Sequence, residues 1–537
     1  MNIEKILEGL NESQRLAVEA PQQPVLVVAG PGTGKTLIIV RRIAYLITKG
    51  ISPDEIVAIT FTNRAASELK DRIKAFHGDL NGLFAGTFHL FGLRIIKEIT
   101  QEAFSIINRE EQVDLVKRLS GSERPSAIIE KISRIKNLLE EPDEKMKKIM
   151  EDYQELLQEK RTFDFDDLII RAIELLGDPT YQEKYRRAIK YLIVDEYQDI
   201  NPLQYRMLRT LSLSRIFVVG DPDQSIYSFR GANVKNFLDF EKDYPRAIKI
   251  VLDRNYRSQP FIVNASESLI RKNKERIQRS ISSIIKEGSP VRVVSVPDDR
   301  AEIEFIVQEI EKRIGGMSHY SLMRGIQAVE GDYSFSDFAV LLRTNNQVLA
   351  MEAELKKAGI PCYVMGGALT ESLREIIEYI EENKDKPLEI LLQELSDRYR
   401  VLSSLLNNYI PTSLDDLINW LKLTGPEEDR LEAEGVRLLT MHMSKGLEFR
   451  VVFIAGLEEG LIPLESSEDI EEERRLLYVA MTRAKEELFL IQARRRLLYG
   501  KTKARKASPF LSEIEEEYID DLFIHDRPRK EKQLGLF

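Results

Sequence analysis

Two stretches of the chain combine residue types that nucleotide chemistry requires. The first is Ala29-Gly30-Pro31-Gly32-Thr33-Gly34-Lys35-Thr36. Glycines let backbone N–H groups turn inward around a phosphate, a lysine here reaches the outer phosphates, and a following threonine hydroxyl can hold Mg²⁺. The stretch predicts a phosphate-binding loop; a glycine-rich turn without a ligand is the alternative. The residues expected to bind nucleotide are Gly30, Gly32, Thr33, Gly34, Lys35 and Thr36.

The second stretch, Tyr191-Leu192-Ile193-Val194-Asp195-Glu196, has the pattern of a buried strand that ends in two carboxylates. Asp195 would hold Mg²⁺ through water, and Glu196 would orient and deprotonate the attacking water. Another apolar run, from Ile216 to Gly220, leads to Gln224, which could sense the γ-phosphate. Together with the phosphate loop, these residues predict a nucleoside triphosphatase.

Aromatic side chains beside a cation follow these strand ends. Tyr227, Phe229 and Arg230 come soon after Gln224, in an arrangement typical of platforms on which single-strand bases stack. Two further predicted strands end in Phe61-Thr62-Asn63 and Gly86-Thr87-Phe88-His89. Ligands on open parallel sheets bind beyond the carboxyl ends of the strands, so these clusters are expected to face the same site. The alternative is that the rings belong to the core.

The elements that would position these residues alternate as in an α/β domain. Val25–Val28 predicts a buried strand, and Leu37–Lys49 predicts a helix that stops at Gly50. Upstream, Asn11 is a good N-cap for a short helix that holds Gln14. The amide of Gln14 could face both edges of an adenine, although an exposed helix residue is the simpler interpretation.

Composition bounds the class of protein. A chain of 537 residues is too long for one core, and its 43% hydrophobic and 31% charged residues are ordinary for a globular protein. We expect no membrane span, no signal peptide and, because Cys362 is the one cysteine, no disulfide framework or cysteine metal site. These features favour the cytoplasm. The net charge of −10 is a weak guide, because a nucleic-acid groove needs only local positive charge.

Two interruptions divide the α/β pattern. Residues 95–180 are charged and helical in spacing, which predicts a helical insertion. Within it, Asp164-Phe165-Asp166-Asp167 could suggest a metal site, but acidic residues that open a helix are explained more simply by its dipole. A second α/β pattern begins at Val291 and is interrupted by a loop over 315–332 and a charged helical segment over 379–433.

In order and over nearly the whole chain, these motifs resemble those of the UvrD/Rep/PcrA family of superfamily 1 helicases. The phosphate loop resembles the Walker A motif, and Asp195-Glu196-Tyr197-Gln198-Asp199 resembles Walker B. Leu10–Val18 resembles the Q motif, Ile59–Asn63 motif Ia and Gly86–His89 motif Ib. Val219–Gly231 resembles motif III, and Asn255–Ser258 resembles motif IV. Thr440–Phe449 resembles motif V, and Tyr478–Ala484 resembles motif VI. The chain departs from the family pattern at three places. Leu37 stands where the family commonly has arginine, and Phe229 stands where it commonly has tryptophan. The insertion of the second domain, called 2B in the family, is strongly shortened.

The resemblance implies a role for each site residue. Gln14 would read the adenine edge, Tyr256 would stack on its face, and Glu448 would hydrogen-bond the ribose. Arg257 and Arg483 would reach the γ-phosphate and complete a catalytic set with Lys35, Glu196 and Gln224, while Thr36 and Asp195 would hold Mg²⁺. The DNA-binding residues would be Phe61, Thr62, Asn63, Thr87, Phe88, His89, Tyr227, Phe229, Arg230 and His442.

The implied architecture is α/β, with two RecA-like P-loop NTPase domains of parallel sheets flanked by helices and with ATP bound between them. Domain 1A would comprise 1–94 and 181–278, around a helical insertion, 1B, at 95–180. Domain 2A would comprise 279–378 and 434–515, around a reduced 2B-like insertion at 379–433. Residues 516–537 would form a flexible C-terminal tail.

The implied activity is ATP-dependent 3′–5′ movement on single-stranded DNA, with unwinding at single/double-strand junctions, in DNA repair or replication. One alternative is a translocase that strips proteins without efficient unwinding. Another is a DNA-binding protein that uses ATP as a conformational latch, against which the set Lys35, Glu196, Gln224 and Arg483 argues.

The chain ends in Gln533-Leu534-Gly535-Leu536-Phe537, after a polar stretch whose composition does not favour folding alone. This ending resembles the peptide by which bacterial proteins dock on the replication sliding clamp. Gln533 would enter a small polar pocket, and Leu534, Leu536 and Phe537 would provide the apolar contacts. The alternative is that the tail folds back on its own second domain.

Overall fold

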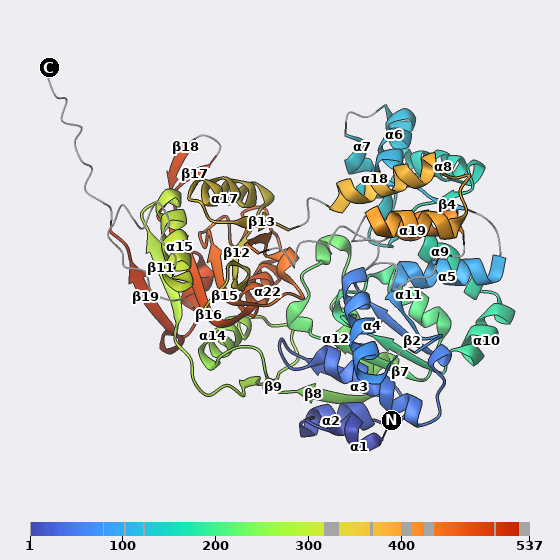
Figure 1. The fold of residues 1–537 in the computed structure, drawn as a ribbon, viewed down its shortest axis with the longest axis horizontal. Coiled ribbons are helices and arrows are strands. Elements are labelled where there is room, and N and C mark those ends of the chain that lie inside the picture. Colours follow the sequence, from blue (N-terminus) through green and yellow to red (C-terminus); the bar gives the residue numbers. More distant parts are fainter. Residues whose placement is uncertain are drawn as a thin grey trace. The chain divides into compact units, whose positions relative to one another are not determined.

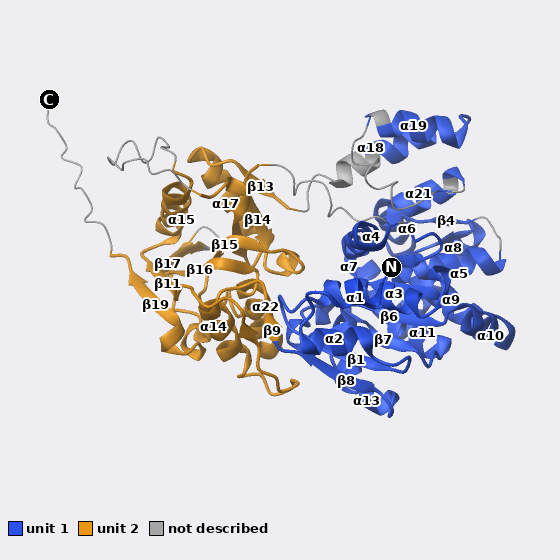
Figure 2. Cartoon of the chain, turned by 60° about the horizontal axis from the view of Figure 1, so that its bottom comes forward, with its two compact units in different colours: residues 1–253, 366–429 blue, residues 254–365, 430–537 orange. Residues whose placement is uncertain are grey.

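The computed structural model describes residues 2–525 except 79, 101–103, 122–123, 316–331, 366–368, 399–410, 412, 424–433 and 499–500. The chain divides into two compact units, coloured separately in Figure 2. Unit 1 comprises Met1–Asp253 and Gly366–Asp429, and unit 2 comprises Arg254–Met365 and Arg430–Phe537. In the described part of the chain no helix is long and apolar enough to cross a membrane.

Unit 1 is built on a six-stranded parallel sheet in the order β3-β2-β6-β7-β1-β8 (Figure 1). Its central strands are apolar along their whole length because helices cover both faces of a parallel sheet. The strands are β1 (Val25–Ala29), β2 (Ile56–Thr60), β3 (Phe84–Thr87), β6 (Tyr191–Val194), β7 (Ile216–Gly220) and β8 (Ile248–Leu252). Two helices, α1 (Ile3–Leu7) and α2 (Glu12–Glu19), precede β1. The helices that follow the strands are α3 (Lys35–Thr48), α4 (Asn63–His77), α5 (Phe88–Thr100), α11 (Pro202–Leu211), α12 (Lys235–Leu238) and α13 (Phe240–Asp243).

A mainly helical insertion follows α5 in the chain. It contains β4 (Ser105–Ile106), α6 (Arg109–Ser120), α7 (Pro125–Lys136), α8 (Glu144–Glu159), β5 (Thr162–Phe163), α9 (Phe165–Leu176) and α10 (Pro179–Ala188). Helix α9 packs closely on α5, since a Cβ at Gly92 would lie 2.7 Å from the carbonyl oxygen of Leu168.

The acidic cluster at the start of α9 is a helix cap and a buried ion-pair site. Asp164 accepts a hydrogen bond from the backbone N–H of Asp167 at 2.9 Å and caps the helix. Lys136 Nζ lies 2.7 Å from a carboxylate oxygen of both Asp164 and Asp167. Because a lysine ammonium already pairs with both carboxylates, the metal interpretation is not supported. No group of His, Cys, Asp or Glu suited to a metal occurs among the described residues.

Unit 2 is built on a seven-stranded parallel sheet in the order β13-β14-β12-β15-β16-β11-β19. Its strands are β11 (Val291–Val296), β12 (Phe338–Leu342), β13 (Cys362–Val364), β14 (Val436–Thr440), β15 (Phe449–Ala455), β16 (Ala484–Ala493) and β19 (Ile519–Phe523). Its helices are α14 (Pro260–Ile270), α15 (Asp299–Ile314), α17 (Asn345–Lys357) and α22 (Ile470–Met481), and short pairs are formed by β9 (Arg254–Asn255), β10 (Ser282–Ser283), β17 (Arg495–Leu498) and β18 (Lys501–Ala504). Two parallel α/β units confirm the predicted fold class.

The unit boundaries differ from the sequence-based expectation at three places. Residues 254–278 group with unit 2, because α14 packs on α22 and β16. The inserted segment 366–429, with α18 (Leu369–Glu382), α19 (Leu388–Arg398) and α21 (Leu414–Leu423), groups with unit 1 rather than unit 2. Residues 519–523 form the edge strand β19, so this part of 516–537 is not a flexible tail. The predicted loop at 315–332 and the clamp-like ending fall almost wholly outside the described residues.

Candidate active site and nucleic-acid interface

The predicted phosphate loop connects β1 to α3 in unit 1. Gly34, the N-cap of α3, has a φ of 90°, a conformation that glycine adopts without strain. The Gln14 side chain donates from Nε2 to the Thr33 carbonyl oxygen at 3.0 Å and accepts at Oε1 from the Asn11 N–H at 3.1 Å. The buried Gln14 amide thus ties α2 to the phosphate loop, and its contact with adenine stays a prediction.

Lys35 is the feature of this loop that fits a phosphate ligand. Its Nζ is buried and has no hydrogen-bond partner among the described residues. The nearest carboxylate oxygen is Glu196 Oε1, at 3.7 Å, which is too far for a hydrogen bond. A buried ammonium without hydrogen bonds is costly, and phosphate oxygens would satisfy it. Thr36 follows in the first turn of α3, where its hydroxyl suits Mg²⁺.

Glu196 adopts a strained backbone conformation directly after β6. Its φ is 49°, in the left-handed region that non-glycine residues rarely occupy. Its N–H donates to Asp195 Oδ1 at 2.9 Å, and its Oε2 accepts from Gln198 Nε2 at 2.5 Å. Strain held by specific contacts is typical of functional sites, so this turn is a candidate catalytic position.

Gln198 connects the ends of two neighbouring strands. While its Nε2 bonds Glu196, its Oε1 accepts from the Asp221 N–H, just after β7, at 2.9 Å. Gly220 makes this approach possible, because a Cβ there would lie 2.2 Å from Gln198 Oε1. The Gln224 amide donates to Asp221 Oδ2 at 2.5 Å and is almost fully buried. The sequence pattern assigns no role to Gln198, although this residue lies within the Walker B-like run.

The predicted aromatic residues form one cluster in unit 1. The rings of Phe61 and Tyr227 stack with centroids 5.1 Å apart, and Tyr227 and Phe229 are 5.9 Å apart. The Arg230 guanidinium lies 5.4 Å from the Tyr227 centroid and 5.6 Å from that of Phe229. Phe229 is 55% exposed, so these rings are not simply core residues. A cationic, partly exposed aromatic cluster suits single-strand bases.

The residues at the start of α5 are less exposed than the sequence suggested. Phe88 is buried, so the proposed interface excludes its ring. His89 is half-buried against Phe165, with ring centroids 6.1 Å apart. Burial lowers the pKa of His89 to about 4, although the Asp164 carboxylate opposes the shift. The imidazole is therefore neutral at physiological pH.

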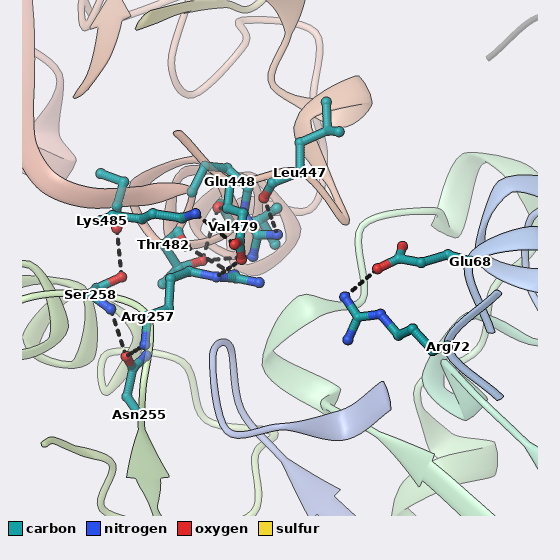
Figure 3. Close-up of polar contacts among 12 residues, drawn as sticks. Glu68, Arg72, Asn255, Arg257, Ser258, Leu447, Glu448, Val479, Thr482 and Lys485 are labelled. Carbon is teal, nitrogen blue, oxygen red and sulfur yellow. Dashed lines mark hydrogen bonds and ion pairs between the residues drawn. The ribbon is translucent and has the colours of Figure 1, made fainter. Parts of the chain in front are cut away.

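Unit 2 brings together Arg257 and Glu448, two residues predicted to meet the nucleotide (Figure 3). Arg257 donates to a Glu448 carboxylate oxygen at 2.7 Å and to the Thr482 carbonyl at 3.3 Å. Lys485 lies 2.7 Å from the other Glu448 oxygen. Although burial opposes it, the charges of Arg257 and Lys485 lower the pKa of Glu448. Tyr256, beside Arg257, is 41% exposed, as a stacking residue requires.

Arg483 lies in the same unit but is directed inward. It donates to the Val479 carbonyl at 2.8 Å and to the Leu447 carbonyl at 3.2 Å, and it is almost fully buried. These contacts tie the end of α22 to the loop that carries Glu448. His442, in the short turn after β14, is half-buried. Contact of either residue with ligand stays a prediction.

Comparisons with known proteins cover both units. Residues 10–245 match the UvrD/REP helicase N-terminal domain, and residues 250–381 and 367–495 match the UvrD-like helicase C-terminal domain. The ATP-dependent DNA helicase PcrA of Staphylococcus epidermidis is 30% identical over 652 aligned positions, which cover 96% of this chain and 87% of that protein. PcrA of Staphylococcus aureus is also 30% identical, with the same coverage. Both alignments exceed the 537 residues of this chain, so these relatives carry residues that it lacks. The chain belongs to the UvrD/Rep helicase family, and it is a helicase that hydrolyses ATP.

Proposed function

We propose that this protein is a Mg²⁺-dependent ATPase that moves 3′ to 5′ along single-stranded DNA. The observation that carries the ATPase part of this proposal is the buried Lys35 ammonium, which has no hydrogen-bond partner among the described residues and faces the strained Glu196 turn. The 3′–5′ polarity is proposed from membership of the helicase family. An unsatisfied cation next to a positioned carboxylate is what phosphoryl transfer to water requires.

Each residue near this turn has a distinct task in the proposal. Lys35 binds the outer phosphates, and Thr36 and Asp195 hold Mg²⁺, which neutralises phosphate charge when bound. Glu196 removes a proton from the attacking water, and Gln198 keeps its carboxylate oriented. Gln224 senses the γ-phosphate.

Residues of unit 2 are also given nucleotide-binding roles in this proposal. Arg257 and Arg483 supply positive charge to the departing phosphoryl group. Glu448 binds the ribose and Tyr256 stacks on adenine. Family membership supports these roles, and the grouping of Arg257, Glu448 and Tyr256 within one unit agrees with them.

For DNA, we propose that bases stack on Phe61, Tyr227 and Phe229. Thr62, Asn63, Thr87, His89, Arg230 and His442 would contact the backbone or the base edges. The partly exposed aromatic cluster with its arginine supports this interface. The movement would serve DNA repair or replication, as expected from the similarity to proteins named PcrA.

Movement with weak unwinding is a second candidate. The relatives carry residues that this chain lacks, and the described part of the segment at the expected 2B position holds α18, α19 and α21, of 14, 11 and 10 residues. A motor with a reduced 2B region would strip proteins from a single strand and require a partner to open duplex DNA.

Direction is tested by streptavidin displacement from oligonucleotides with biotin at one end. Movement from 3′ to 5′ predicts ATP-dependent release of streptavidin from the 5′ end and none from the 3′ end. Release from the 3′ end would contradict the proposed polarity. Unwinding of 3′-tailed duplexes, measured with the same preparation, distinguishes a helicase from a translocase that only strips proteins.

We also propose that the C-terminal residues Gln533, Leu534, Leu536 and Phe537 dock on the bacterial sliding clamp. Support comes from the sequence alone. A tethered clamp would raise the concentration of the motor at DNA without new motor–DNA contacts. Titration of a fluorescent 526–537 peptide with clamp tests this. Saturable binding that Leu536→Ala and Phe537→Ala abolish is expected, and equal binding by the variant peptide would contradict it.

A further inference from the structure

Helix α21 lies in a segment that the chain order assigns to unit 2 but that packs with unit 1 (Figure 2). The chain leaves unit 2 after Met365 and returns to it at Arg430. Between these points, α21 contacts α5 and β4 of unit 1. The contacts include specific polar pairs as well as apolar packing, so the position of α21 on unit 1 is well defined.

The first contact is with the free edge of β4. The N–H groups of Ser105 and Ile107 donate to backbone carbonyls on the β5 side of the strand. The backbone N–H and carbonyl of the intervening residue, Ile106, face the opposite side. There Asn419 Oδ1 accepts from the Ile106 N–H at 2.9 Å, and Asn419 Nδ2 donates to the Phe104 carbonyl at 3.1 Å. Lys422 Nζ donates to the Ile106 carbonyl at 2.9 Å. Side chains of α21 therefore satisfy an edge that would otherwise be unpaired.

The second contact is with α5. Lys97 forms an ion pair with Asp416, whose side chain is only 6% exposed. A carboxylate this buried depends on its partner, because without the lysine nothing would compensate the cost of removing its charge from water. Leu423 joins Leu93 and Ile96 of α5 in one apolar cluster, and Leu90 packs against the cluster that contains Trp420.

The third contact reaches a residue of the proposed DNA interface. Leu423 is the last residue of α21, where helix carbonyls lack intrahelical partners. Its carbonyl accepts from Asn63 Nδ2 at 2.5 Å. The other end of this amide, Asn63 Oδ1, is a buried acceptor without a hydrogen-bond partner among the described residues. The end of α21 therefore fixes the orientation of the Asn63 amide and leaves its acceptor for another group.

We propose that α21 is a fixed brace of the single-strand interface, and that Asp416, Asn419 and Lys422 are positioning residues for DNA binding. The brace holds the start of α4, with Asn63, and the helix α5 that follows Thr87. The inserted segment thus acts as part of unit 1 and not as an arm that swings on unit 2. This inference rests on the proposed function, because it assumes that these strand ends contact DNA.

The test compares the affinity of full-length variants for oligo-dT by fluorescence anisotropy. Asp416→Lys and Asn419→Ala are expected to weaken binding about tenfold, the effect of losing one charged or well-buried hydrogen bond. ATP affinity without DNA should not change. The matched control is Glu394→Lys, which breaks an ion pair with Lys386 inside the segment. This control should bind DNA as wild type does.

A charge swap separates positioning from loss of fold. Lys97→Asp combined with Asp416→Lys should restore the affinity that each single variant loses. The segment holds the one tryptophan of the chain, Trp420, which is almost fully buried. Its emission should shift to the red in the single variants and return in the double variant. Wild-type DNA affinity in a single variant whose emission has shifted would overturn the proposal.

A cross-link tests the fixed position directly. Lys97→Cys and Asp416→Cys, in a Cys362→Ser background, can be joined by a short bismaleimide. The uncross-linked double-cysteine protein lacks the Lys97–Asp416 ion pair and should bind single-stranded DNA weakly. The covalent link replaces that pair, so cross-linking should restore activity on single-stranded DNA, whereas a swinging arm predicts that cross-linking abolishes it. Failure of the proposed function is distinguishable, since Phe61→Ala, Tyr227→Ala and Asn63→Ala would then all bind oligo-dT as wild type does.

Discussion

The Lys35 ammonium lies 3.7 Å from the Glu196 carboxylate, close enough for attraction but too far for a hydrogen bond. Glu196 is held from its other side by Gln198 at 2.5 Å. The carboxylate is therefore positioned by a neutral amide, while the cation remains available for phosphate. Substitutions of Lys35, Glu196 and Gln198 should therefore have different effects.

Glu196→Gln should abolish ATP hydrolysis while ATP binding survives. The loss of a general base typically costs about 10²–10⁴-fold in rate, and the amide preserves the shape and the bond from Gln198. Steady-state hydrolysis and binding of a fluorescent ATP analogue measure the two effects. Lys35→Ala should instead weaken binding itself, because the outer phosphates lose their cation. Hydrolysis by Glu196→Gln within a few-fold of wild type would remove Glu196 from its role.

Gln198→Leu should lower kcat by about 10²-fold with little change in ATP affinity. A small displacement of the general base, Glu196, lowers the rate at which it removes the proton from water. The side chain keeps its approximate size but no longer donates to Glu196 or accepts from Asp221. Gln182→Leu is the control, since it makes the same substitution at a glutamine whose side chain donates to the Thr210 carbonyl and contacts neither Glu196 nor Asp221. Equal rates for the two variants would show that Gln198 does not position the base.

Tyr227→Ala should cost about 1–3 kcal/mol of single-strand affinity, as expected for a lost stacking platform. Phe229→Ala should weaken binding as well. Phe523→Ala is its control, because Phe523 is 54% exposed in unit 2 and lies outside the proposed interface. Titration of each variant with labelled oligo-dT measures the effect. If the protein unfolds instead of losing DNA affinity, the rings are core residues.

The stability of unit 1 should depend on the protonation of His89. Its folded pKa of about 4 is below the unfolded value of about 6.5, so the unfolded chain binds more protons between these values. The contribution of His89 to the free energy of unfolding is fully present above about pH 6.5. It falls as the pH approaches 4, by at most about 1.4 kcal/mol per pH unit.

Thermal unfolding of wild type and His89→Gln between pH 7.5 and 5 measures this effect. Burial, with a further contribution from Asp164, raises the pKa of Asp167 to about 6, which changes stability in the opposite sense. Only the difference between the two proteins therefore isolates His89. The wild type should lose more stability on acidification, and parallel curves would contradict the assignment.

Local sequence predicted the strand ends of unit 1 well, because glycines, buried apolar runs and terminal acids are local signals. The cap at Asp164 was also predictable, since capping depends on neighbouring residues. The grouping of α21 with unit 1 was not, because its contacts join residues that are far apart in the chain, as in the pair Asn63–Leu423. For the same reason, the sequence placed the segment with the domain that flanks it.

The role of Gln198 also depends on tertiary structure. Only the parallel pairing of β6 with β7 brings the Asp221 N–H to its amide. The burial of Phe88 could not be inferred either, because an aromatic residue at a strand end suits both a core and a stacking surface. Pattern alone therefore predicted which residues form the ATP site but not the contacts that hold them.

The rate of ATP hydrolysis with and without single-stranded DNA tests the central claim most directly. A motor that couples the Lys35–Glu196 site to the aromatic cluster should hydrolyse ATP slowly alone and much faster with saturating oligo-dT. Tyr227→Ala should require more DNA to reach the same maximal rate. A rate that oligo-dT does not change would contradict the account, because it would indicate an ATP-dependent latch rather than a motor.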